Sequence, residues 1–169
     1  ASSIADLPHI QHLDLTDNRM SSGAIAKTML QLTKNPHLLS LSLACNKLSR
    51  VAVSNLCKGL EDLSALTALN LSSCSLNDSD GARVARVLTN QLTLVKADLS
   101  HNKLEQQSGH AFANTLRENF ALQELILNWN TIRGAGGEAL GLALASNSTL
   151  TKLDLAWNSL GDRSAYAIA

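Results

Sequence analysis

Residues 150–160 read LTKLDLAWNSL, and variants of this stretch recur along the whole chain. The apolar residue that opens each copy is followed by the next after 28 positions (38 − 10, 66 − 38 and so on), at Ile10, Leu38, Leu66, Leu94, Leu122 and Leu150. A fixed period in this range is the signature of a solenoid, in which each unit buries its apolar face against its neighbours. The period therefore predicts a stack of similar units, an architecture typical of binding surfaces.

Each unit combines a strand pattern with a polar turn that recurs at the same position of the unit. The fourth and sixth positions are apolar and two residues apart, as in a short strand with one buried face. The ninth position is Asn in five units and Cys in the third, at Cys74. An amide there can donate to and accept from backbone groups that would otherwise be buried without partners. We expect a structural ladder of asparagines, with Cys74 as a weaker substitute and not a redox site.

The second half of each unit has the spacing of an amphipathic helix. Apolar residues recur at i, i+1, i+4 and i+8, which in the third and fourth units are Val84, Ala85, Leu88 and Leu92, then Phe112, Ala113, Leu116 and Phe120. We expect these side chains to face the sheet.

Glycine and asparagine recur at two further positions of the unit. Glycines at one shared position are expected to form a tight turn just before each helix, and they are Gly81, Gly109 and Gly137. Val53 and Ile25 take this position in the second and first units, so their turns should differ. Near the helix ends, asparagines are expected in the left-handed conformation, namely Asn35, Asn119 and Asn147.

Composition narrows the classes of function. Lys and Arg together number 14, as do Asp and Glu, so the formal net charge is zero, which argues against nucleic-acid binding through a basic surface. No run of about 18 apolar residues is present, so membrane insertion is not expected. The three cysteines lack metal-type spacing, so we expect no metal and no cofactor, and a reducing, cytoplasmic location.

The repeated pattern L-x-x-L-x-L-x-x-N/C-x-L, followed by an Ala-rich helix and preceded by the NSTL stretch at 147–150, resembles the ribonuclease-inhibitor-type leucine-rich repeat. This superfamily includes ribonuclease inhibitor, the sensor ends of NOD-like receptors, Ran GTPase-activating protein, tropomodulin, CARMIL and ciliary leucine-rich-repeat proteins. The resemblance covers residues 10–169. It implies an α/β fold, a curved solenoid with a parallel β-sheet on the concave face and α-helices on the convex face. It also implies intracellular proteins that bind other proteins on the concave face.

The resemblance and the period together predict the domain organisation. We expect one leucine-rich-repeat domain over residues 1–169, with six units starting at 10, 38, 66, 94, 122 and 150, the last of them incomplete. Solenoids need polar end caps for solubility, and none is visible, so we expect the chain to be a fragment of a longer array.

Candidate binding residues occupy the outward third, fifth, seventh and eighth positions of the C-terminal units. Trp129 and Trp157 lie one repeat apart, and neighbouring strands are about 5 Å apart, so their indoles should lie side by side. Exposed tryptophans are enriched at binding hot spots; alternatively, both rings fold over the strand edge and shield the asparagine turns. The residues predicted to bind a partner are Trp129, Trp157, Asn128, Glu124, Ile126, Asp98, His101 and Asp154.

Two other patterns on this face have competing interpretations. Asp14, Asp98 and Asp154 share the fifth position, and they form either a weak acidic stripe for a basic partner or a solvated mixed face with nearby lysines. His101, Asp98 and a serine one strand away (Ser72 or Ser73) could be imagined as a catalytic triad. An open sheet offers no oxyanion hole and does not exclude water, so we expect no enzyme.

These observations predict a non-catalytic protein-interaction or scaffold module that binds a protein partner on its concave face, as part of a larger chain or complex. Three alternatives stay open: a structural component of the cytoskeleton or of a ciliary axoneme, a small-GTPase regulator resembling Ran GTPase-activating protein, and a segment of an innate-immune sensor. The corresponding location is the cytoplasm, with the cytoskeleton or cilium as specific sites within it.

Overall fold

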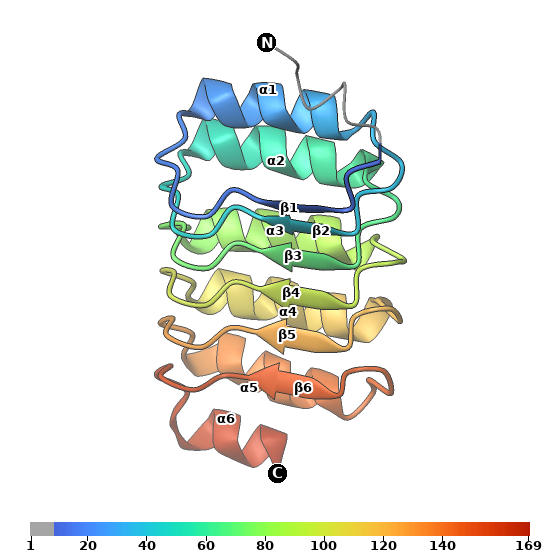
Figure 1. The fold of residues 1–169 in the computed structure, drawn as a ribbon. Helices are drawn as coiled ribbons and strands as arrows, with labels where there is room; N and C mark the ends of the chain where they lie inside the picture. Colours follow the sequence, from blue (N-terminus) through green and yellow to red (C-terminus); the bar gives the residue numbers. More distant parts are fainter. Residues whose placement is uncertain (1–8) are drawn as a thin grey trace.

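The computed structural model of the protein describes residues 9–169. Over this range the chain is a stack of six strand–helix units, with a parallel sheet as one layer and a row of helices as the other (Figure 1). The strands are β1 (His12–Asp14), β2 (Ser40–Ser42), β3 (Ala68–Asn70), β4 (Lys96–Asp98), β5 (Glu124–Ile126) and β6 (Lys152–Asp154). The helices are α1 (Ser22–Leu32), α2 (Arg50–Asp62), α3 (Asp78–Thr89), α4 (Gln106–Glu118), α5 (Gly134–Leu144) and α6 (Gly161–Ile168).

The sheet keeps the 28-residue period as its register. Strand order follows chain order, and each residue pairs in parallel with the one 28 positions later, as Leu41 does with Leu69. The backbone hydrogen bonds continue past the strands in the same register, since the Leu43 N–H donates to the Asn70 carbonyl oxygen (2.9 Å) and the Cys45 N–H to that of Ser72 (2.9 Å). The predicted α/β solenoid of 28-residue repeats is confirmed.

The core between the two layers is almost entirely aliphatic, with Phe112 as its largest fully buried side chain. Val84, Leu88 and Leu116 are buried on the helices as predicted. The prediction is wrong for Leu92 and Phe120, which are 82% and 68% exposed. Helix α3 ends at Thr89 and α4 at Glu118, so both residues lie in the following loops, where the helical spacing no longer determines which way a side chain points.

The ninth-position asparagines form the expected structural ladder. The Asn102 amide nitrogen donates to the carbonyl oxygens of Leu71 (2.9 Å), Leu99 (3.0 Å) and Ser100 (3.1 Å), while its oxygen accepts from the Cys74 N–H (3.1 Å). Each side chain thus bonds backbone groups of its own unit and of the preceding one. The same pattern holds for Asn46, Asn130 and Asn158.

Cys74 fills the ladder position of the third unit with fewer hydrogen bonds. Its thiol donates to the carbonyl oxygens of Leu43 (3.2 Å) and Ser72 (3.5 Å). It has no side-chain oxygen, so the Leu48 N–H donates to the Cys74 backbone carbonyl instead (3.0 Å). Burial raises the pKa of the Cys74 thiol to about 12, which keeps it protonated and unreactive at neutral pH.

The recurring glycines set the spacing between helices, and the prediction of turns before the helices is wrong. Gly81, Gly109 and Gly137 lie inside α3, α4 and α5. A Cβ atom on Gly81 would lie 2.4 Å from Leu104 Cδ2, and one on Gly109 would lie 2.8 Å from the backbone of Gly136. At Gly109, where the neighbouring atoms are backbone, only glycine allows such a close approach of neighbouring units.

Because the glycine position lies inside the helices, the departure of the first two units at this position concerns helix packing and not a turn. Ile25 and Val53 occupy the glycine position inside α1 and α2, and both are buried. Their branched side chains take up volume that the glycines leave free in the later units.

A second ladder lies where the strands begin. The predicted left-handed asparagines are absent, because Asn35, Asn119 and Asn147 all have negative φ. Their side chains instead bond the backbone of neighbouring units: Asn119 donates to the carbonyl oxygens of Leu88 (2.9 Å) and Gln91 (2.7 Å). Asparagine is therefore retained at this position for its amide and not for its tolerance of positive φ.

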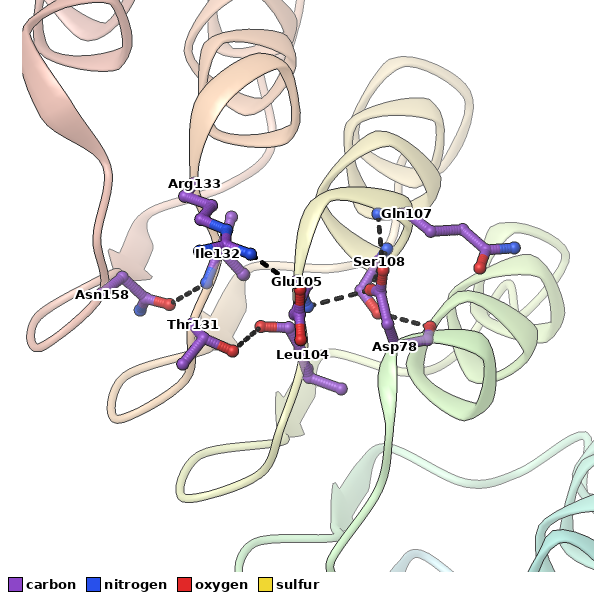
Figure 2. A network of polar contacts seen from close by, with 9 residues as sticks. All are labelled: Asp78, Leu104, Glu105, Gln107, Ser108, Thr131, Ile132, Arg133 and Asn158. Atoms are coloured by element: carbon purple, nitrogen blue, oxygen red, sulfur yellow. Dashed lines mark hydrogen bonds and ion pairs between the residues drawn. The ribbon is translucent and has the colours of Figure 1, made fainter.

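Helix α4 receives its N-terminal cap from the preceding unit. Glu105, which precedes the helix, makes no capping hydrogen bond with its side chain. The Asp78 carboxylate accepts instead from the N–H groups of Glu105 (2.9 Å), Gln107 (2.9 Å) and Ser108 (2.7 Å), as Figure 2 shows. Burial raises the pKa of Asp78, but the hydrogen bonds from Ser108, Glu105 and Gln107 outweigh it and hold the pKa below 3.8. An anion is also stabilised by the dipole at this end of a helix.

We expect Asn102→Ala to lower the free energy of unfolding by about 3 kcal/mol, because several buried backbone groups lose their partner at once. Urea denaturation followed by circular dichroism measures the change. Asn114→Ala is the matched control, since Asn114 is exposed on α4 and its side chain bonds only that of Arg117 among residues 9–169. A loss in Asn102→Ala no larger than in this control would contradict a stabilising ladder.

We expect Asp78→Asn to cost about 1 kcal/mol at pH 7, as for the loss of a helix cap. The folded-state pKa lies below the unfolded value of 3.8. The carboxylate therefore stabilises the fold above that value, and this is lost as the pH falls through the folded-state pKa. The stability difference between wild type and variant, measured by urea denaturation from pH 7 to pH 2.5, should shrink in that window. A difference that stays constant down to pH 2.5 would contradict a stabilising Asp78 carboxylate.

Candidate functional site

The residue at the eighth position of each unit has a left-handed backbone. Its φ lies between 52° and 58° in all six units described, at Asp17, Cys45, Ser73, His101, Trp129 and Trp157. Such values are uncommon for residues other than glycine. Since the N–H of Trp129 donates to the Ala156 carbonyl oxygen (2.9 Å) and that of His101 to Asn128 (3.0 Å), the turn is held in register with its neighbours. Side chains at this position therefore project side by side.

In the last three units this geometry produces a continuous stack of rings. The ring centroids of Trp129 and Trp157 are 4.6 Å apart with an interplanar angle of 15°, and those of His101 and Trp129 are 5.4 Å apart at 11°. Trp129 is 47% exposed and Trp157 69% exposed. We call His101, Trp129 and Trp157 the aromatic row. The predicted side-by-side placement of the two indoles is confirmed, and His101 extends it by one unit.

A smaller group of predicted residues lies on the strands beside the aromatic row. Ile126 is 8% exposed and is the one apolar residue at a fifth position within the units described. The Asn128 amide nitrogen donates to Asp154 Oδ2 (2.9 Å), while Asn128 Oδ1 is buried without a hydrogen-bond partner among residues 9–169. An unpaired buried acceptor costs about 1–3 kcal/mol, so this is a locally unsatisfied part of the surface.

Charged side chains at the third position pair across strands. Lys96 Nζ lies 3.2 Å from Glu124 Oε2, and Glu124 is also in register with Lys152 of the next strand. The predicted site residue Glu124 is therefore already paired with Lys96 and is not a free carboxylate.

The aspartates of the predicted acidic stripe have a local structural role that neither interpretation included. Asp98 Oδ1 accepts from the Ser100 N–H (2.9 Å), Asp154 Oδ1 from that of Ala156 (3.0 Å) and Asp14 Oδ1 from that of Thr16 (2.9 Å). The hydrogen bonds from the Thr16 side chain and backbone lower the pKa of Asp14 below 3.8. Each carboxylate thus fixes the turn that leads to the eighth position.

The residues considered as a catalytic triad are not joined by hydrogen bonds in the part of the chain that the structure describes. Within residues 9–169, no hydrogen bond joins His101 to Asp98, Ser72 or Ser73; the Asp98 carboxylate is bonded to the Ser100 backbone and the His101 ring is stacked on Trp129. The described part of the chain also contains no group of three or more His, Cys, Asp or Glu side chains placed to hold a metal ion. None of its helices combines the length and apolar character needed to cross a membrane.

Reasoning from the sequence missed the surface features of the helix layer. Hollows of about 310 and 340 Å³ lie between α2 and α3, and three cations line them: Lys58, Arg83 and Arg86. The sequence carries one signal, since Val53 occupies the position where later units have glycine. A sequence pattern alone does not show how the neighbouring helices pack.

Comparisons with known proteins agree with this architecture. A model of the leucine-rich repeat family matches residues 6–26, 34–57, 63–85, 118–141 and 146–169, which is more than half of the chain. No curated protein matches the sequence in a direct comparison.

Solved structures share the fold at low sequence identity. The C-terminal domain of tropomodulin from Caenorhabditis elegans aligns with a TM-score of 0.68 and 18% identity, covering 81% of this chain and 83% of that chain. A structure of leiomodin-1 actin-binding site 2 aligns with a TM-score of 0.65 and 16% identity, covering 99% of this chain and 84% of that one. The repeated family match and the 28-residue stack of strands and helices lead to one conclusion: this protein belongs to the leucine-rich repeat family.

Proposed function

We propose that this protein is a non-catalytic protein-interaction module whose strand face binds a protein partner through the aromatic row. The observation that carries the proposal is the pair of stacked, exposed indoles of Trp129 and Trp157. Tryptophan is enriched among the residues that dominate binding energy at interfaces, and two adjacent copies form an apolar surface with a polar surround.

Stacking prepares the aromatic row for binding. The rings of His101 and Trp157 lie on either side of Trp129, so its side chain has already lost much of its rotational freedom. The loss of conformational entropy on binding is therefore smaller, because these side chains are already ordered. The indole N–H groups make no hydrogen bond within residues 9–169 and are donors for acceptors on a partner.

The neighbouring predicted residues have supporting roles in this proposal. Ile126 is only 8% exposed and adds a small apolar area on the strand, and Asn128 with Asp154 borders the row with polar groups. Asp98 and Glu124 are already engaged within the protein, so we place them at the rim and not at the centre of the interface.

We expect the double variant Trp129→Asn, Trp157→Asn to lose binding of the protein partner by at least tenfold, because it removes both anchors. Asparagine tolerates the left-handed conformation of these positions, so the turns should be retained. The measurement is recovery of bound proteins on the immobilised domain, quantified by mass spectrometry against the wild type.

Phe120→Asn is the matched control for this experiment. Phe120 is an exposed aromatic residue in the loop after α4 and lies outside the aromatic row. This variant should recover the same partners as the wild type. Unchanged recovery by the double tryptophan variant would exclude the aromatic row as the binding surface.

A cytoskeletal partner is the second, more specific candidate. It is supported by the similarity in fold to leiomodin-1 actin-binding site 2, which aligns over 99% of this chain. The likeness itself is one of fold. The small-GTPase regulator and the immune-sensor segment stay alternative hypotheses, without added support from the geometry of the strand face.

We expect the wild-type domain to sediment with actin filaments or to bind monomeric actin, and the double tryptophan variant to bind less. Co-sedimentation and fluorescence anisotropy with labelled monomer measure the two forms. If wild-type protein binds neither form but still recovers other partners through the aromatic row, actin is excluded while the interaction surface stands.

A further inference from the structure

Helices α2 and α3 leave a groove on the helix layer, on the side of the molecule opposite to the strands. Their backbones approach each other less closely than those of any other neighbouring helices. The second unit has Val53, which is fully buried, at the glycine position, whereas Gly81 and Gly109 allow α3, α4 and α5 to pack closely. The two hollows of about 310 and 340 Å³ lie between α2 and α3.

The side chain whose hydrogen bond joins the ends of these two helices is longer than the corresponding side chains of later units. Asn119 and Asn147 bond the carbonyl oxygen 31 residues earlier, at Leu88 and Leu116. Between α2 and α3 the same bond is made by Gln91 to Leu60 (2.6 Å), and glutamine is one methylene longer than asparagine. Gln91 therefore makes, with a longer side chain, the hydrogen bond that asparagine makes between the later units.

The groove is lined by more positive than negative charge. Lys58 of α2 and Arg83 and Arg86 of α3 face a single lining carboxylate, Glu61. None of these four side chains forms an ion pair within 4.0 Å among the residues described, where both ion pairs found lie elsewhere. An overall neutral chain thus carries a local excess of unpaired cations in a concave site, and such a site attracts anions.

The spacing of the cations indicates the form of the anion. Arg83 and Arg86 are three residues apart on one helix, so their side chains leave it about 5–6 Å apart. An extended peptide presents alternate side chains on one side at about 6.6 Å. From Ser54 to Glu61, the lining of α2 rises by roughly 10 Å at about 1.5 Å per residue, which is the length of about three extended residues.

We propose that the groove between α2 and α3 binds a short acidic segment of a protein, extended and carrying carboxylates at alternate positions. Arg83 and Arg86 would each pair with one carboxylate, since a guanidinium matches the planar shape of this group, and Lys58 would contribute from the opposite wall. This is a second interaction surface, independent of the aromatic row. Its concave shape between two helices favours a peptide over a membrane, which meets a protein as a broad flat surface.

The test uses the wild-type domain and a fluorescent peptide with glutamate at alternate positions, followed by anisotropy at low salt. The same peptide with glutamine in place of glutamate should not bind. We expect Arg83→Gln combined with Arg86→Gln to weaken binding by up to about fivefold for each arginine removed, the range of exposed ion pairs. Arg117→Gln on α4, which removes the same charge outside the groove, should leave the affinity unchanged.

Glu61→Gln provides a gain-of-binding test that misfolding cannot mimic. It removes the carboxylate that faces the incoming anion, so binding of the acidic peptide should tighten by about twofold. The double variant Trp129→Asn, Trp157→Asn should bind the acidic peptide like the wild type, which separates this proposal from the one for the strand face.

Three results would overturn the groove proposal. The first is an equal loss of peptide binding in Arg117→Gln and in the double arginine variant, and the second is unchanged peptide binding by Glu61→Gln. The third is binding to vesicles containing about 30 mol% phosphatidylserine without binding to the acidic peptide. The last result would assign the cations to an anionic lipid surface.

Discussion

In every unit the chain turns away from the sheet, and this turn buries backbone carbonyl groups that need hydrogen-bond donors. The side chain at the ninth position supplies them. An amide there donates to carbonyl oxygens of two adjacent units and accepts from the N–H groups of the preceding turn, as Asn102 shows. Leaving such groups unpaired in a low-dielectric interior is costly. The ladder therefore fixes both the turn and the distance between units. The left-handed eighth residue, and with it the position of Trp129 and Trp157, is a consequence of that turn.

The period was sufficient to predict the sheet because a parallel register is itself a repeat in sequence. Leu41, Leu69 and Ala97 pair across strands for the same reason that they are 28 residues apart. Helix ends were less predictable, and Leu92 and Phe120 were wrongly assigned to the buried face. Apolar spacing continues into a loop by chance, whereas the helix ends where the chain turns to start the next strand.

Contacts between units could not be predicted from the sequence pattern alone. Asp78 caps a helix of the next unit, which requires knowing that the start of α3 lies beside the start of α4. The inter-helix role of Gly81 and the backbone bonds of Asn119 have the same origin. The adjacency of the two tryptophans was predictable, since both occupy one repeat position. His101 shares that position one unit earlier, so its place beside Trp129 follows from the same repeat. The turn-fixing role of Asp154 required the geometry of the side chains.

The boundary between the second and third units combines three departures from the repeat: Val53 in place of glycine, Cys74 in place of the ladder asparagine, and Gln91 in place of asparagine at the helix end. In a linear stack, stability is a sum of units and of nearest-neighbour couplings, and partial opening starts where the coupling is smallest. We therefore expect this boundary to be the point at which the stack opens first. Under tension or mild denaturation the first two units should separate as a pair from the four later units, of which the last three carry the aromatic row.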